Sequence, residues 1–391
     1  MSKGLIPLLI AQFLSAFADN AILFTVIAMV MQSTELPSWY VPALQSVFLV
    51  SFVVLGPWVG GIADRYVKSK LLFVANVIKA IGAGLLFFHV EPLLAYCIVG
   101  LGAAIYSPAK YGILPELTPD NQLIKANSWI EGSTILAILT GMVVGARVAD
   151  YSLSLALLGT LGLFFSSALL TLLIPNQLGR PKPDGSRFLL FIKQTRYFIG
   201  HHRSRFALLS ASMFWGAAAS VRVILVAWAP LVLMLHTATE IASLTLFLAI
   251  GIIIGSAITP WLIPMHHLRK TRFAAYAMGL MIFGLAFSTQ IELSQGLLLL
   301  MGCAGGLFIV PINATLQSLG QHSIGSGNAV AMQNFFQNLS MLISVGLYTL
   351  AASMTISPIT ALMVLGSLLV IATGILSLIL PATDKITDHQ S

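Results

Sequence analysis

The stretch GGIADRYVKSK, residues 60–70, is a short polar interval between two long apolar runs. Gly60 permits close approach of a neighbouring helix, because small residues let helix backbones come together. Asp64 can cap or pair with a neighbouring helix end, where the helix dipole favours a negative charge. The basic residues of the stretch indicate the cytoplasmic side of a membrane. The stretch therefore predicts a short loop between two membrane helices.

The composition agrees with a membrane protein. The chain has 391 residues, of which 58% are hydrophobic and 8% charged, and its mean hydropathy is +0.93. A soluble domain carries about 25% charged residues, so this chain is expected to be solvated by lipid. Its two cysteines, Cys97 and Cys303, lie in apolar segments and predict small buried side chains rather than a disulfide.

Apolar runs of about 20 residues, the length that a membrane helix needs, recur along the whole chain. The expected spans are 4–31, 41–63, 70–89, 92–117, 122–147, 153–175, 205–235, 240–263, 273–290, 296–319, 326–350 and 358–380. The sequence thus predicts an all-α polytopic membrane protein with twelve transmembrane helices in two six-helix halves. The halves are residues 1–175 and 205–391, and a cytoplasmic linker, 176–204, joins them.

Lysine and arginine positions predict the orientation. With the N-terminus inside, sixteen of the twenty basic residues fall on the cytoplasmic side, and one, Arg147, falls outside. Three remain in the membrane: Lys79, Lys110 and Arg222. Both termini are therefore expected in the cytoplasm, and the pI near 9.5 is explained by topology rather than by nucleic-acid binding.

Residues 186–199 of the linker alternate apolar and basic side chains, which suits a helix lying on the inner membrane surface and binding anionic lipid. A plain linker that follows the positive-inside rule is the alternative. The two halves also resemble each other weakly: aligning Pro108 with Pro311 places Lys110 opposite Asn313. Duplicated transporter halves predict a substrate site near mid-membrane between them.

Several charges lie deep in the expected spans. Asp19 is central in QFLSAFADNAILFT, residues 12–25, where a charge costs about 2.5–3.5 kcal/mol. Asp19 and Arg222 are expected to form a pair or share a hydrated cavity, with a purely structural ion pair as the alternative. For Lys110 a pair with Glu131 is plausible, against snorkelling to the interface. Lys79 is left open between a structural and a functional role.

Amides line the later spans. Gln333 and Asn334 belong to a polar face in the expected span 326–350, and Asn313 lies in the span before it. They could form a hydrogen-bonding wall for a ligand or only join neighbouring helices. Glycines four apart in GMVVG, 141–145, and GIIIG, 251–255, predict close helix packing or a seam that opens to lipid.

Two resemblances add to these interpretations. The stretch 60–70 resembles the loop signature of the major facilitator superfamily, which implies that Gly60, Asp64, Arg65 and Lys68 act in gating. Val67 stands where that signature usually has glycine.

Other stretches resemble the bacterial lysophospholipid transporter family within that superfamily. They are QFLSAFADNAILF, AAIYSPAKYGILPELT, KANSWIEGSTILAILTG, FWGAAASVRVILVAW, VPINATLQ and GNAVAMQN. This resemblance implies movement of lysophosphatidylethanolamine and lysophosphatidylglycerol from the outer to the inner leaflet of the bacterial inner membrane, by alternating access with lateral lipid entry. It implies a separate or fused acyltransferase/acyl-carrier-protein synthetase as a partner. Gln337 stands where an acidic residue is expected.

The implied substrate assigns roles to the polar residues. Its phosphate suits Arg222 and Lys110, the latter beside Tyr111, since cations bind phosphate oxygens. Asp19 suits either the ethanolamine ammonium or Arg222. The remaining substrate-binding candidates, for the head group and its hydroxyls, are Asn20, Glu131, Asn313, Gln333 and Asn334.

Three other classes of protein are alternatives: a drug exporter, a membrane enzyme and a channel. A proton-coupled exporter of amphipathic drugs would use the same scaffold, with Asp19 or Glu131 titrating. A fused acyltransferase would need an HxxxxD motif, which the chain lacks. No catalytic residue, metal or cofactor is expected, and paired central charges favour a carrier over a channel.

Overall fold

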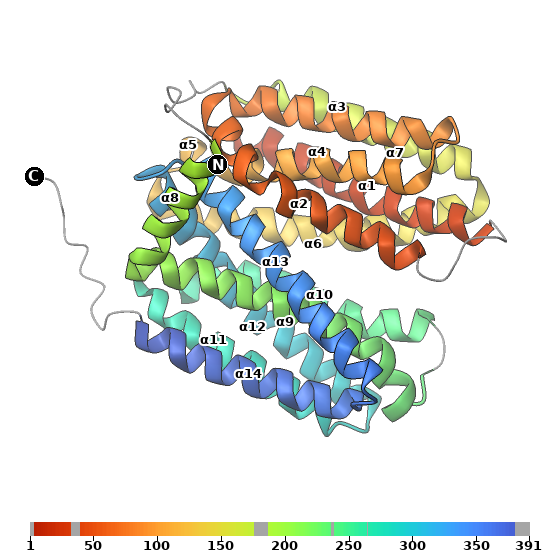
Figure 1. Ribbon diagram of the computed structural model, residues 1–391, viewed down its shortest axis with the longest axis vertical. Coiled ribbons are helices and arrows are strands. Elements are labelled where there is room, and N and C mark those ends of the chain that lie inside the picture. Colours follow the sequence, from red (N-terminus) through yellow and green to blue (C-terminus); the bar gives the residue numbers. More distant parts are fainter. Residues whose placement is uncertain (1–3, 33–39, 176–186, 236–237, 264, 380–391) are drawn as a thin grey trace, which may run out of the picture. The chain divides into compact units, whose positions relative to one another are not determined.

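The computed structural model describes residues 4–32, 40–175, 187–235, 238–263 and 265–379, and their regular secondary structure is helical (Figure 1). The N-terminal part of the chain forms α1 (Leu5–Gln32), α2 (Tyr40–Arg65), α3 (Lys68–Phe87), α4 (Pro92–Gly112), α5 (Leu114–Leu117), α6 (Asp120–Tyr151) and α7 (Leu153–Thr171). They are followed by α8 (Arg187–Gly200), α9 (His202–Val232), α10 (Ala238–Leu262), η1 (Met265–Lys270), α11 (Thr271–Ala286), α12 (Ile291–Gln321), α13 (Ser326–Ser353) and α14 (Pro358–Ile379).

The long helices coincide with the expected spans. Within the described ranges, 11 helices are long and apolar enough to cross a membrane. The expected span 273–290 corresponds to α11, which has 16 residues. At 1.5 Å per residue it is about 24 Å long, shorter than a hydrocarbon core of about 30 Å. The fold class, a helical polytopic membrane protein, is confirmed, with one helix shorter than predicted.

The expected span 92–117 is not one continuous helix. It ends as α4 at Gly112 and resumes as the short α5, with Pro115 in the first turn of α5. Proline cannot donate a backbone hydrogen bond and clashes with the preceding turn. The break therefore follows from Pro115.

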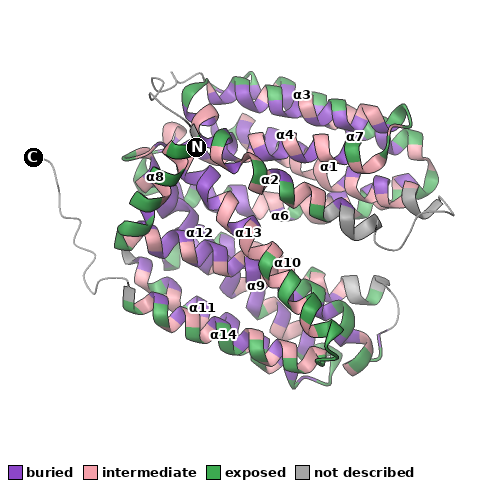
Figure 2. Cartoon of the chain, in the orientation of Figure 1, coloured by how far each residue is buried: buried purple, intermediate pink, exposed green. Residues whose placement is uncertain are grey.

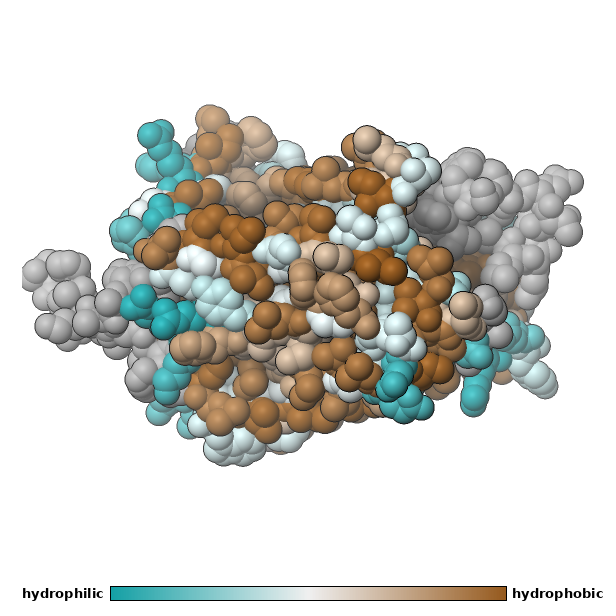
Figure 3. Space-filling model, turned by 90° about the horizontal axis from the view of Figure 1, so that it is seen from below, coloured by the Kyte–Doolittle hydropathy of each residue, from teal (hydrophilic) through white to brown (hydrophobic). Residues whose placement is uncertain are grey.

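Apolar side chains cover much of the surface. Leu94, Ile81 and Leu280 are more than half exposed, and exposed residues follow the outward faces of the long helices (Figure 2). On the face in Figure 3, hydrophobic side chains dominate the middle, while hydrophilic ones gather toward its two ends. This distribution is that of a surface in contact with lipid along its middle.

By compactness, the chain divides into two units. The first comprises residues 1–195 and 316–343, and the second comprises residues 196–315 and 344–391. The end of α12 and the start of α13 thus group with the N-terminal helices. The division into sequence halves at 176–204 remains a prediction.

In the first unit, α1 packs against α6 and α7, α3 packs against α4 and α7, and α2 packs against α4. Its core contains the fully buried Ile22 of α1, Leu86 of α3, Val99 of α4 and Phe164 of α7. In the second unit, α14 packs against α9 and α11. In the first unit, α7 therefore packs against both α1 and α3. This arrangement brings polar residues of α1 and α3 close to each other.

The linker helix is confirmed as α8. Its side chains Phe188, Leu189 and Ile192 are exposed, and so are Lys193 and Arg196. This mixture of apolar and basic exposed residues fits the predicted surface helix, whose binding to lipid remains a prediction. Lys3, Arg180, Lys182 and Lys385, four of the residues used to predict the topology, lie outside the described residues.

Candidate substrate-binding site

A buried ion pair joins the middle of α1 to the middle of α3. The Nζ atom of Lys79 donates a hydrogen bond to Oδ2 of Asp19 at 2.7 Å. The Lys79 side chain is 1% exposed and the Asp19 side chain 18% exposed. Pairing offsets part of the large cost of removing each charge from water. The structure therefore gives Asp19 a partner, Lys79, that differs from the predicted one, Arg222.

A chain of hydrogen bonds extends from this pair. Lys79 Nζ also donates to Ser15 Oγ at 3.0 Å, and Ser15 Oγ donates to Asn76 Oδ1 at 2.8 Å. Asn76 Nδ2 donates to Ser167 Oγ at 2.8 Å, and Ser167 Oγ donates to the carbonyl oxygen of Ala11 at 2.6 Å. The network links α1, α3 and α7, so it holds the Lys79 ammonium in one position.

This network was not predicted from the sequence, although the spacing of its residues was visible there. Ser15 lies four residues before Asp19, and Asn76 lies three residues before Lys79. Residues at these spacings share one face of a helix. The spacing shows a polar face on each helix, but only the packing shows that the two faces meet.

The neighbouring helix α4 shapes the space around Lys79. A Cβ atom on Gly102 would lie 2.6 Å from Cγ of Lys79, so the stem of the lysine requires glycine there. The Lys79 Nζ atom lies 4.6 Å from the ring centroid of Tyr106, close enough for a cation–π contact. Both α4 residues therefore help to confine the charge.

Asp19 keeps one oxygen unused. Its Oδ1 atom is buried and has no hydrogen-bond partner among the described residues. Buried polar atoms are nearly always paired, so this oxygen is a candidate acceptor for a bound ammonium or a guanidinium. Arg222, the predicted partner, belongs to α9 in the second unit, and its side chain is exposed. Its action on Asp19 remains a prediction.

A second charged group lies on α4 and α6. Tyr111 donates a hydrogen bond through its hydroxyl to Oε2 of Glu131 at 3.1 Å. The Nζ atom of Lys110 lies 4.2 Å from the centroid of the Tyr111 ring. Within the described residues, Lys110 makes no ion pair with Glu131. The two side chains thus form no direct ion pair in the described residues, and Tyr111 contacts both of them.

Lys110 is 8% exposed, so it does not extend freely to the membrane surface as the snorkelling alternative required. The Lys110 ammonium forms no ion pair with a described carboxylate, and an ammonium has three donors to offer. An anion entering this region would accept hydrogen bonds from these donors.

The amide side chains divide between two roles. Asn20 donates to the carbonyl oxygen of Ala16 in its own helix at 2.8 Å. Asn334 of α13 donates to Ser107 Oγ of α4 at 2.8 Å. For Asn334 the structure thus shows the helix-joining contact, which was the alternative to ligand binding.

Other amides are buried in the first unit. Gln333 and Gln337 are 6% and 7% exposed, and Nε2 of Gln337 has no hydrogen-bond partner among the described residues. Asn127 of α6 and Gln317 of α12 donate to each other, at 2.9 and 2.8 Å. The reciprocal pair fixes the end of α12 to α6, a contact typical of amides that join helices in lipid.

The Asp64 carboxylate caps the start of α13. Its Oδ1 accepts the backbone N–H of Gly327 at 2.7 Å, and its Oδ2 accepts from Asn328 N and Nδ2 at 2.9 and 2.7 Å. Lys68 pairs with Asp64 at 3.7 Å and also with Glu116 of α5. The prediction that Asp64 caps a neighbouring helix is confirmed, and its role in gating remains a prediction.

The rest of the gating candidates lie around this cap. A Cβ atom on Gly60 would lie 2.7 Å from Cα of Asn328, which confirms the close helix approach. The Arg65 side chain is exposed and lies 5.3 Å from the ring centroid of Tyr66. Close packing against α13 thus requires glycine at position 60, whereas the exposed side chain of Arg65 is not held by such packing.

The paired glycines pack against helices of their own unit. A Cβ atom on Gly141 would lie 2.5 Å from the carbonyl oxygen of Phe17, so α6 touches the backbone of α1. Gly251 and Gly255 of α10 lie in the same way against α12, near Cys303. The close-packing interpretation is what the structure shows for both motifs.

In the second unit, Asn313 of α12 is 5% exposed. Its role, like that of Arg222, is carried by the sequence resemblance alone. No group of three His, Cys, Asp or Glu side chains that could hold a metal ion occurs in the described ranges.

Comparison with known proteins identifies the family. Residues 8–345 match the Major Facilitator Superfamily. "Lysophospholipid transporter LplT" of Klebsiella pneumoniae subsp. pneumoniae is 39% identical over 376 residues, covering 95% of this chain and 94% of the relative. The protein of the same name from Photorhabdus laumondii subsp. laumondii is 38% identical, covering 94% of each chain.

A solved structure supports the fold. A crystal structure of the E. coli fucose:proton symporter FucP superposes with a TM-score of 0.76 at 16% identity, covering 95% of this chain and 97% of that one. The family match, together with the fold, thus defines a membrane transporter. The chain belongs to the Major Facilitator Superfamily and, within it, to the family whose members include the Lysophospholipid transporter LplT proteins.

Proposed function

We propose that this chain transports lysophospholipids, such as lysophosphatidylethanolamine and lysophosphatidylglycerol, from the outer to the inner leaflet of the bacterial inner membrane. The observation that carries the proposal is the 39% identity over 95% of the chain to a relative of that name. The relatives give no comparable support to a proton-coupled exporter of drugs.

The phosphate of the substrate would bind near Lys110. This side chain is buried, carries a positive charge and forms no direct ion pair with a carboxylate among the described residues. A phosphate oxygen accepts strong, charge-assisted hydrogen bonds from such a donor. Glu131 then acts by holding Tyr111, whose ring lies against the Lys110 ammonium. Arg222 is proposed as a second cation for the same phosphate.

The Asp19 oxygen that lacks a partner would accept the ethanolamine ammonium. With Lys79 on Oδ2, the carboxylate still has lone pairs directed elsewhere from Oδ1. A lysophosphatidylglycerol has no ammonium, and its glycerol hydroxyls can donate to the same atom. Asn20, Asn313, Gln333 and Asn334 remain proposed contacts for the rest of the head group.

The product of transport would be a lipid with one acyl chain in the inner leaflet. Restoring the bilayer lipid then requires an acyl transfer to the free hydroxyl. An acyltransferase/acyl-carrier-protein synthetase is therefore the proposed partner, acting after transport.

The test is inward movement of labelled lysophosphatidylethanolamine in spheroplasts that lack their own transporter. Wild type is compared with Lys110→Met, Asp19→Asn and Arg222→Ala, with and without a protonophore. Since hydrogen bonds to charged groups contribute about 1.5–3 kcal/mol, uptake by Lys110→Met is expected to fall about tenfold to 100-fold. Matched controls are Lys193→Gln and Asp120→Asn, which change exposed residues of α8 and α6.

Uptake by wild type that the controls retain and Lys110→Met loses would support the proposal. No uptake by wild type, with folded protein in the membrane, would overturn it. Uptake abolished by the protonophore would instead point to a proton-coupled carrier.

A further inference from the structure

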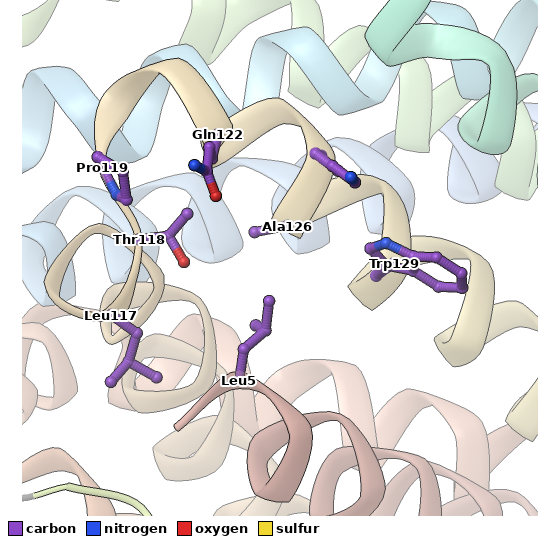
Figure 4. Close-up of a pocket in the computed structure, with 8 residues that line it drawn as sticks. Leu5, Leu117, Thr118, Pro119, Gln122, Ala126 and Trp129 are labelled. Atoms are coloured by element: carbon purple, nitrogen blue, oxygen red, sulfur yellow. The ribbon is translucent and has the colours of Figure 1, made fainter. Parts of the chain in front are cut away.

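A small pocket opens at one end of the first unit, where the start of α1, the connection from α5 to α6 and the first turns of α6 meet (Figure 4). Its lining residues are Leu5, Leu117, Thr118, Pro119, Gln122, Lys125, Ala126 and Trp129. Asp19, Lys110 and Glu131 are not among them. The pocket is therefore distinct from the candidate substrate site.

Thr118 supplies an unused polar atom to this pocket. The residue is 7% exposed, and its Oγ1 atom is buried without a hydrogen-bond partner among the described residues. Threonine is not part of a helix here, because it lies between the end of α5 and the start of α6. Its hydroxyl, on the pocket side in Figure 4, is free to donate to a ligand oxygen.

The charge of the pocket is positive. Lys125 is its charged lining residue and is exposed. Of the nearby carboxylates, Glu116 is paired with Lys68, and Asp120, in the first turn of α6, does not line the pocket. An anionic group entering the pocket would meet Lys125 without a competing carboxylate on the lining.

The apolar part of the lining is placed to hold a lipid. Trp129 is 52% exposed and lies four residues after Lys125, on the same face of α6. Leu5 and Ala126 form a buried apolar wall. Lys125 and Trp129 both fall within the first ten residues of α6, and tryptophan is enriched near the membrane–water interface.

We propose that this pocket binds the phosphate-bearing head group of a membrane phospholipid that is not the transported molecule. The Thr118 hydroxyl donates to a phosphate oxygen, and the Lys125 ammonium pairs with the phosphate. Trp129 and Leu5 contact the glycerol and the first methylene groups of the acyl chains. The site thus fixes an anionic lipid at the junction of α1, α5 and α6.

The experiment is native mass spectrometry of the full-length protein, delipidated in detergent and titrated with phosphatidylglycerol. Wild type is compared with Lys125→Gln and Thr118→Val, and with Lys70→Gln as a control that removes another exposed lysine. The first phosphatidylglycerol is expected to bind about tenfold more weakly to Lys125→Gln, a difference of ~1.4 kcal/mol. Thr118→Val is expected to weaken it severalfold, and Lys70→Gln to leave it within twofold.

Equal weakening by Lys125→Gln and Lys70→Gln, with no effect of Thr118→Val, would overturn the proposal in favour of general attraction to basic helix ends. A second arm adds glycerol 3-phosphate, which has the head-group phosphate without acyl chains. If it binds as tightly as the lipid, the apolar wall has no role and a soluble phosphate ester is the ligand. Binding that requires the acyl chains supports the lipid.

Discussion

Two Asp–Lys pairs of the first unit are built differently. Asp64, at the end of α2, uses both carboxylate oxygens: it accepts from Gly327 and Asn328 of α13 and pairs with Lys68. Asp19, in the middle of α1, contacts Lys79 through Oδ2 and leaves Oδ1 without a partner. A fully satisfied carboxylate stabilises one arrangement of helices. A partly satisfied one, held among apolar helices, is poised to take a further donor.

The largest effect is expected at Asp19. Asp19→Ala leaves the Lys79 ammonium buried without a counter-charge, which costs about 3–5 kcal/mol. Asp19→Ala combined with Lys79→Met removes both charges and is expected to recover most of the stability, without recovering transport. Thermal unfolding in detergent and uptake of labelled lysophospholipid measure the two properties. If the double variant were as unstable as Asp19→Ala, the ion pair would not explain the tolerance of these charges.

A smaller loss is expected at Asp64. Asp64→Ala leaves the backbone N–H groups of Gly327 and Asn328 without their acceptor, at a cost of about 1–3 kcal/mol. Asp64→Asn keeps one acceptor oxygen and should lose less. Both are compared by thermal unfolding. Equal stability of wild type and Asp64→Ala would show that water or another group can cap α13. Asp64 would then not stabilise the helix arrangement in the way that distinguishes it from Asp19.

Gly325, next to the same cap, tests how closely it is packed. Its φ of +101° is a conformation that side chains rarely adopt, and an added Cβ would contact the Asp64 carboxylate. Gly325→Ala should cost about 1–2 kcal/mol from the backbone conformation alone. Gly346→Ala, in α13 with no atom near the added Cβ, is the matched control. A control that lost as much stability as Gly325→Ala would remove the local explanation.

The smallest effect is expected at Tyr111. Tyr111→Phe removes the hydrogen bond to Glu131 and keeps the ring beside Lys110, so about 1 kcal/mol of stability should be lost. Uptake should fall much less than in Lys110→Met, because the cation remains. Uptake lost completely in Tyr111→Phe would assign the hydroxyl a direct role with the substrate.

Most of the fold could be predicted from the sequence, because the signal for each membrane helix lies in the residues of that helix. Each membrane helix is a run of apolar residues long enough to cross the bilayer, so its presence can be predicted without knowing its neighbours. The departures have local causes as well: Pro115 ends α4 early. The capping role of Asp64 was predictable because Asp64 lies in a short polar interval between two apolar runs, where a carboxylate can meet the positive end of a neighbouring helix.

The site was harder to predict. The presence of Asp19, Lys79, Lys110 and Glu131 in the membrane follows from their positions in apolar runs. Their partners do not, since Asp19 and Lys79 are 60 residues apart in the chain. Lys110 and Glu131, which sequence suggested as a pair, are joined instead through the hydroxyl and ring of Tyr111.

By itself, the sequence determined that the chain is a membrane transporter of this family, which helices it forms, and which residues carry charge into the lipid. The tertiary structure alone decided which charges pair directly among the described residues: Lys79 with Asp19, Asp64 with the start of α13, and Lys110 with no carboxylate at ion-pair distance. The physical reason is the separation in the chain between the residues on which each property depends. Helix formation and transfer into lipid depend on neighbouring residues in the chain, whereas a hydrogen bond depends on a few ångströms between helices that only packing brings together.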